Sequence, residues 1–199
     1  MGHNRDIQDF WAELSPCDHV VQIYESTNGF IETLAKFVSE GFTVGDSVVI
    51  IATAEHRLAL EQRLIELGFP EVTDPDNIQY IAVDAVDVMR NILVAQQPDE
   101  ILFRKEILGL LARARSTGRR VRAFGEIVAL MWANGYNGGT VRLEYLWHEF
   151  CRNEELTLFC AYPRSGFTKS ADASIEEICA LHSKVLPSLD EMTGPTSPV

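Results

Sequence analysis

Short apolar runs alternate with amphipathic stretches along most of the chain. The first run, residues 19–24, has little polar alternation, as is typical of a parallel strand covered on both faces. A helix over residues 30–40 is predicted by apolar positions at helical spacing, namely Phe30, Leu34, Phe37 and Val38. With a second apolar run over residues 47–52, these elements form a βαβ unit of the kind that opens a nucleotide-binding sheet.

The same alternation continues to the end of the apolar region. Further strands are predicted over residues 78–83, 119–124 and 156–161. Further helices are predicted over residues 54–67, 84–94, 99–116, 127–135, 141–153 and 174–186. Thr53 and Thr140 are placed as N-caps, and Gly41 as the cap that ends the first helix. The pattern predicts an α/β fold with a mainly parallel sheet and helices on both faces.

No internal repeat or linker divides the chain. We expect a polar lead-in over residues 1–18, a single domain over 19–186 and a disordered tail over 187–199, which is rich in Thr, Ser and Pro. A short helix in the lead-in would dock on the domain through its apolar side chains, Phe10, Trp11 and Leu14.

The turn after the first strand lacks the residues that hold a phosphate. Such a loop needs small residues whose N–H groups converge on an anion, a Lys for the outer phosphates and a hydroxyl for Mg²⁺. Here the segment 25–30 reads ESTNGF, with Asn28-Gly29 as the expected turn, no Lys and Glu25 at its mouth. A nucleotide-type scaffold with a degenerate phosphate loop is the interpretation.

Composition and charge narrow the class of protein. The chain has 199 residues, 46% hydrophobic and 23% charged, which is typical of a globular protein. A net charge of −12 argues against binding nucleic acid or an anionic membrane surface. No apolar run reaches the roughly 18 residues of a membrane span, and no signal peptide is recognisable, so a cytoplasmic location is expected.

The cysteines give no metal motif. Cys17, Cys151, Cys160 and Cys179 are far apart, and a zinc site read from sequence needs His and Cys in short clusters. We therefore expect four reduced, mostly buried thiols, no metal and no cofactor.

Polar and aromatic residues gather where the predicted strands end, the edge at which parallel sheets bind ligands. The candidate ligand-binding residues are Tyr24, Glu25, Thr53, His56, Arg57, Glu126, Trp132, Trp147 and Tyr162. If the first and fourth strands are neighbours, Glu25 and Glu126 would form a carboxylate pair suited to acid–base chemistry or a cationic ligand. Alternatively, each carboxylate caps a helix amino end, where the helix dipole favours a negative charge.

Several of these residues have a purely structural alternative. His56 and Arg57 would pair with Glu25 or Glu126, more simply as ion pairs than in catalysis. Trp132, Tyr136, Trp147 and Tyr162 line either a ligand pocket or the core. Outside this edge, His19 is expected to be a satisfied structural histidine and His148 to pair with Glu144 along a helix. The arginines between 113 and 122 form either a solvated face or a docking patch for an acidic partner.

A set of short segments, in order and spacing, resembles the MEDS family, the methanogen/methylotroph DcmR sensory domain. The segments are HVVQIYE, GDSVVIIATAEHR, DA at 84–85, VRAFGEIVALMW, LEYLW and LFCAYP, and the resemblance covers residues 17–165. It implies a three-layer, KaiC/RecA-like sheet, with the first strand at the phosphate-loop position and VRAFGE at the Walker B position. The resemblance places no role on His148, which stands where the family pattern suggests Asn.

The resemblance implies a sensory domain of bacterial signalling rather than an enzyme. We expect a stand-alone regulatory domain that binds a small, hydrocarbon-derived molecule at the strand ends and signals through protein contacts. The expected partners are a histidine kinase or regulator, and a second copy of the chain in a homodimer. The alternatives are a degenerate nucleotide-binding, ATPase-like protein and a pure protein-interaction module of a signalling complex.

Overall fold

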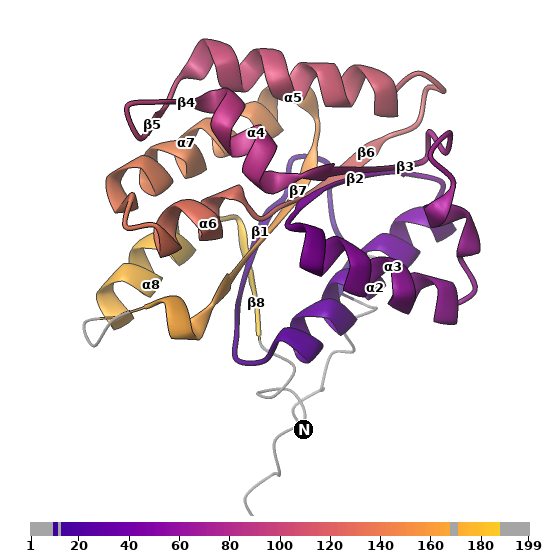
Figure 1. The fold of residues 1–199 in the computed structure, drawn as a ribbon, viewed down its shortest axis with the longest axis horizontal. Helices are drawn as coiled ribbons and strands as arrows, with labels where there is room; N and C mark the ends of the chain where they lie inside the picture. Colours follow the sequence, from indigo (N-terminus) through magenta and orange to yellow (C-terminus); the bar gives the residue numbers. More distant parts are fainter. Residues whose placement is uncertain (1–9, 12, 168–170, 188–199) are drawn as a thin grey trace, which may run out of the picture.

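The computed structural model describes residues 10–11, 13–167 and 171–187, and these form a three-layer α/β fold (Figure 1). A parallel sheet of six strands occupies the middle layer, in the order β3-β2-β6-β7-β1-β8. Its strands are β1 (His19–Tyr24), β2 (Ser47–Ala52), β3 (Tyr80–Asp84), β6 (Val121–Gly125), β7 (Thr157–Pro163) and β8 (Lys184–Leu186). The predicted α/β class with a parallel sheet is confirmed.

The helices cover both faces of the sheet. One face carries α2 (Thr27–Thr43) and α3 (Ala54–Glu66). The other face carries α4 (Ala85–Ile92), α5 (Glu100–Ala114), α6 (Ile127–Ala133), α7 (Asn137–Glu154) and α8 (Ala171–Ala180). A two-stranded ribbon, β4 (Leu93–Val94) with β5 (Gln97–Pro98), joins α4 to α5.

Successive strand residues point to opposite faces of the sheet and pack into two separate cores. In β2, Val48 and Ile50 pack toward α2 and α3, whereas Val49 and Ile51 pack toward α4–α7. All six residues of β2 are buried, as are all six of β1. This double burial explains why the strands read as continuous apolar runs.

The structure corrects four local predictions. Ser26 caps α2 and accepts a hydrogen bond from the N–H of Gly29, so Asn28 and Gly29 lie in the helix rather than in a turn. Gly41 is buried inside α2, and Thr140 lies inside α7, so neither is a cap. The last predicted helix ends at Ala180, and residues 184–186 form β8 instead.

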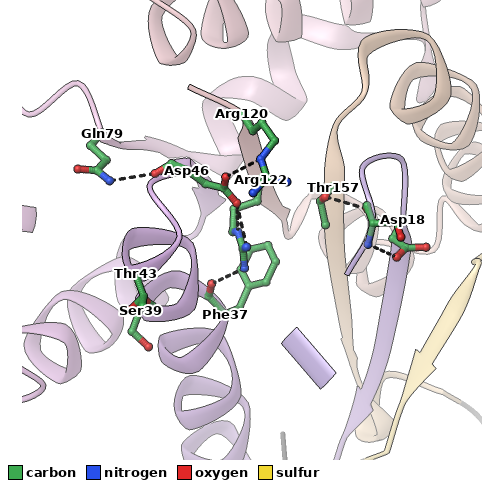
Figure 2. Close-up of polar contacts among 10 residues, drawn as sticks. Asp18, Phe37, Ser39, Thr43, Asp46, Gln79, Arg120, Arg122 and Thr157 are labelled. Atoms are coloured by element: carbon green, nitrogen blue, oxygen red, sulfur yellow. Dashed lines mark hydrogen bonds and ion pairs between the residues drawn. The ribbon is translucent and has the colours of Figure 1, made fainter. Parts of the chain in front are cut away.

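At the amino ends of the strands, a buried ion pair joins the sheet to α2 (Figure 2). Arg122, in β6, donates through Nε and Nη2 to Oδ2 of Asp46, at 3.0 and 2.9 Å, and through Nη1 to the carbonyl of Phe37. The exposed Arg120 contacts the other carboxylate oxygen of Asp46 at 3.2 Å. Arg122 therefore belongs neither to a solvated face nor to a docking patch, since it is 5% exposed.

The backbone of α2 at Gly41 lies close to the side chain of Arg122. A Cβ at position 41 would lie 2.7 Å from Cδ of Arg122. Only glycine leaves room here for the guanidinium to pass beneath α2.

The end of the lead-in docks as predicted. Trp11 is 1% exposed and its ring packs against Phe37 and Phe159, while Phe10 and Leu14 lie at the edge of the same core. The tail was predicted to be disordered over residues 187–199, and from residue 188 onward it lies outside the described part of the chain. The four cysteines are free thiols, two buried and two half-buried. Among the described helices, none combines the length and the apolar content needed to cross a bilayer.

Candidate functional site

The carboxyl ends of β2 and β6 bring Thr53, His56 and Glu126 together. Ile51 in β2 is paired in register with Gly125 in β6, and the N–H of Glu126 donates to the carbonyl of Ile51 at 2.9 Å. The residue that follows each strand therefore faces its neighbour across the sheet edge. This is the edge at which ligands bind in open parallel sheets.

Glu126 is the centre of this group. Its side chain is 9% exposed, and its carboxylate accepts the backbone N–H of Thr53 on Oε2, at 2.7 Å. Oε1 lies 2.8 Å from Nδ1 of His56, in the first turn of α3. Thr53 caps α3 as predicted, with its hydroxyl accepting the N–H of His56. The Glu126 carboxylate thus binds a helix amino end, as the structural alternative expected. That helix is α3, since the side chain makes no cap hydrogen bond to α6.

The contact with Glu126 favours the charged form of His56. The pKa of His56 is raised, chiefly by its hydrogen bond to Glu126, although burial acts in the opposite direction. Since Nδ1 faces Glu126, the opposite ring nitrogen is the one available to a ligand. The dyad can therefore present an N–H donor whose charge the buried carboxylate balances.

An aromatic wall lies beside the dyad. Phe30, at the start of α2, packs edge-on against the His56 ring at 5.2 Å between centroids. Tyr24 stacks on the Phe30 ring at 4.6 Å. Burial raises the pKa of Tyr24 to about 12, with a further contribution from the charge of Glu126, so Tyr24 keeps its proton at neutral pH. The site combines one polar dyad with an apolar face.

The dyad makes stability depend on pH in a definite direction. Because the pKa of His56 is raised on folding, its contribution is complete below the ordinary pKa of 6.5 and is lost as the pH rises through the raised value. We expect His56→Gln to lower the free energy of unfolding by about 1–3 kcal/mol at low pH and by less at high pH. Urea unfolding of both proteins across this range measures the difference, and a difference independent of pH would contradict the assignment.

The two carboxylates of the predicted pair do not meet. β7 lies between β1 and β6, so the ends of the first and fourth predicted strands are not neighbours. Glu25 instead forms an ion pair with Arg164, beyond the end of β7. The carboxylate-pair hypothesis was therefore wrong for this fold.

Arg57 lies one residue beyond the dyad and finds a different partner. It pairs with Asp84, at the end of β3, at 3.2 Å, rather than with Glu25 or Glu126. Both side chains are about a quarter exposed, so this pair links α3 to the end of β3 at the surface.

The predicted aromatic residues lie on the opposite face of the sheet. Trp147 is fully buried against Phe103 and Phe150, which favours the core alternative. Trp132 is half-buried, and its indole N–H donates to the carbonyl of Gly166. Tyr162 is buried and donates its hydroxyl to Glu144, and burial raises its pKa well above its usual range.

Glu144 is the centre of a second polar group that sequence reasoning missed. Its carboxylate is fully buried between the imidazoles of His19 and His182, each with Nε2 at 3.4 Å from Oε2. Cys160 lies 3.5 Å from Nε2 of His19. Glu144 therefore faces these rings rather than pairing with His148 along α7, and His19 is not satisfied, because its buried Nδ1 has no hydrogen-bond partner within the described chain.

Burial acts on the pKa values of both His19 and Glu144 in this second group. It lowers the pKa of His19, more than the neighbouring Glu144 raises it. It also acts to raise the pKa of Glu144, but the neighbouring His182 and His19 outweigh it and hold that pKa below its ordinary range. A carboxylate thus persists in a fully buried position.

The fold and its strand-end dyad define a three-layer α/β domain with a candidate binding site at the carboxyl edge of its sheet. A family model, described as the MEthanogen/methylotroph, DcmR Sensory domain (MEDS), matches residues 18–183. The chain therefore belongs to the MEDS family, a family of sensory domains, which supports a sensory or regulatory role.

One solved structure adds evidence on the fold alone. The protein PH0250 from Pyrococcus horikoshii OT3 matches with a TM-score of 0.61, covering 94% of this chain and 89% of its own. Its sequence identity with this chain is 13%. A comparison with curated proteins finds no match.

Proposed function

We propose that this chain is a non-enzymatic sensory domain that binds a small organic molecule at the strand ends, beside the dyad of Glu126 and His56. The observation that supports this most is a buried carboxylate held against an imidazole and a helix amino end, at the edge of the sheet where ligands bind. The dyad also stabilises the fold, and the proposal adds a role in recognition to that contribution.

The lining indicates the chemistry of the ligand. His56 offers a hydrogen-bond donor next to the amino end of α3, which favours an oxygen or another electron-rich atom. The buried stack of Tyr24 on Phe30, 9% and 1% exposed, makes the surroundings of the His56 ring apolar. We infer a ligand with a short hydrocarbon part and one hydrogen-bond acceptor, such as a simple alcohol, aldehyde or halogenated alkane.

A thermal-shift screen of the full chain tests this proposal. The screen covers small alcohols, aldehydes, halogenated and methylated compounds, common metabolites and nucleotides. A ligand present at about 100 times its Kd stabilises the folded state by roughly 2.7 kcal/mol. We expect a hit among the small organic compounds, and we expect Glu126→Gln to abolish the shift.

Glu55→Gln is the matched control, because Glu55 is a carboxylate in the same turn of α3 as His56 but is exposed. It should retain the ligand-induced shift. An equal loss in both variants would contradict the assignment of the site to Glu126, and a collapse of the melting temperature in Glu126→Gln without ligand would make that residue structural.

The proposal also includes a relation to KaiC/RecA-like ATPases, with a phosphate loop that no longer holds a nucleotide. Only Glu25 and Ser26 separate β1 from α2, and Glu25 is engaged by Arg164. This leaves no glycine-rich loop to cradle a phosphate and sets a carboxylate where one would sit. A nucleotide hit in the screen would support the ATPase-like alternative, and no hit from any class would support a pure protein-interaction module.

The signalling route also belongs to the proposal. We infer a cytoplasmic domain that passes its signal to a histidine kinase or a regulator through protein contacts, in agreement with the sensory character of its family. We further infer that two copies associate. Light scattering of the purified chain, with and without a ligand from the screen, measures this association.

A further inference from the structure

The second polar group, on the other face of the sheet from the dyad, consists of His19, Glu144, Cys160 and His182. His19 is the first residue of β1, Cys160 lies within β7, Glu144 lies in α7 and His182 follows α8. One ligand atom from each of the four lies within 4.8 Å of the others. Neither the sensory role nor the strand-end site uses these residues.

Three of the distances between donor atoms match those of a tetrahedral metal centre. With Zn–N and Zn–O bonds of about 2.0–2.1 Å and a Zn–S bond of about 2.3 Å, neighbouring N and O ligands lie about 3.4 Å apart, and N and S ligands about 3.5 Å. Nε2 of each histidine lies 3.4 Å from Oε2 of Glu144. Sγ of Cys160 lies 3.5 Å from Nε2 of His19.

Hydrogen bonds explain these distances less well. A bond between an imidazolium and a carboxylate is about 2.7–2.9 Å long. Among the described residues, Oε2 of Glu144 and Nε2 of His182 have no hydrogen-bond partner, although the side chains of both residues are 0% exposed. Buried polar atoms without partners are costly, and a shared cation would satisfy both.

The outer contacts also fit ligands of a metal. Nδ1 of His182 lies 2.7 Å from the carbonyl of Ile178, so Nδ1 carries the proton and a neutral ring turns its Nε2 lone pair toward Glu144. Tyr162 donates to the other carboxylate oxygen of Glu144 and so orients Oε2. Backbone carbonyls and hydroxyls in these positions fix metal ligands in known sites.

We propose that His19, Glu144, Cys160 and His182 bind a divalent transition-metal ion, with zinc the best fit to two nitrogen, one oxygen and one sulfur ligand. The carboxylate and a thiolate would balance the two positive charges, giving a neutral centre in a fully buried place. Binding releases the thiol proton of Cys160. With four protein ligands the site is closed, so the ion would hold α8 and β8 to the sheet rather than carry out chemistry.

Metal binding by the full, untagged chain tests this proposal. The protein is stripped with a chelator, dialysed and titrated with Co²⁺ and then with Zn²⁺. We expect one ion per chain, tetrahedral cobalt absorption with a thiolate-to-cobalt charge-transfer band, and displacement of the cobalt by zinc. A chain that takes up no ion, or that gives octahedral cobalt absorption without a thiolate band, would overturn the proposal.

Four variants locate the site. Cys160→Ser should lose the charge-transfer band, and Glu144→Gln should weaken zinc binding at least about 100-fold. Cys17→Ser, a thiol outside the group, should behave as the wild type. Tyr162→Phe keeps the shape of the core and should weaken binding by about 10–100-fold, which retains a test if Glu144→Gln fails to fold. An unchanged charge-transfer band in Cys160→Ser would place the metal elsewhere and overturn the assignment.

Discussion

Replacing Arg122 with Ala should lower the free energy of unfolding by about 3–5 kcal/mol, because it leaves the buried carboxylate of Asp46 without its main partner. Arg122 and Asp46 are 5% and 6% exposed. The guanidinium also satisfies the carbonyl of Phe37 and lies over its ring, 5.2 Å from the centroid. The exposed Arg120 remains beside Asp46, so we expect a loss near 3 kcal/mol.

Urea unfolding measures this loss, and Arg120→Ala is its matched control (Figure 2). Arg120 contacts the same carboxylate, but its side chain is 64% exposed, so its removal should cost at most about 1 kcal/mol. Pairing Arg122→Met with Asp46→Asn removes both charges and should recover part of the stability. Equal losses in the two single arginine variants would contradict a buried, dominant pair.

Replacing Trp11 with Ala should cost about 3–5 kcal/mol, which is the range for truncating a buried Trp. The indole is 1% exposed, and its ring centroid lies 5.0 Å from those of both Phe37 and Phe159. It therefore fills the space between α2 and β7 at the edge of the core. The melting temperature and the urea midpoint should both fall.

Trp11→Phe is the conservative control for this prediction. It keeps an aromatic ring in the site and removes the indole N–H, which is buried without a hydrogen-bond partner within the described residues. The loss should be about half as large as for Ala, or smaller. If Trp11→Ala unfolds at the wild-type urea concentration, Trp11 does not contribute to the core in solution.

The sequence predicted most of the strands and helices, which depend mainly on residues close together in the chain. β1, β2, β6 and β7 are largely apolar because both of their faces are covered, whereas β3 is buried only at its first two residues. β8 was missed because it has three residues and begins with a charged one, Lys184. The start of α2 was misplaced because Asn28-Gly29 resembles a turn, whereas the Ser26 cap and tertiary packing favour helix.

The sequence did not predict most contacts between side chains that are far apart in the chain. Arg122 sits 76 residues from Asp46, and only the placement of β6 beside β2 makes it a buried ion pair. His56 and Glu126 were correctly predicted as possible partners because both follow strands, but strand order decided against Glu25. The group around Glu144 joins segments from position 19 to position 182, so no short spacing could indicate it.

The most direct test of the proposed sensory role is residue-resolved NMR of the full chain, titrated with the compound that stabilises it most in the thermal-shift screen. If the ligand binds at the strand ends, the largest shifts should fall on the amides of Thr53, His56 and Glu126, and Glu126→Gln should remove them. Shifts confined to another surface, such as the cleft lined by Arg57, Tyr80 and Arg113, would contradict binding at the dyad.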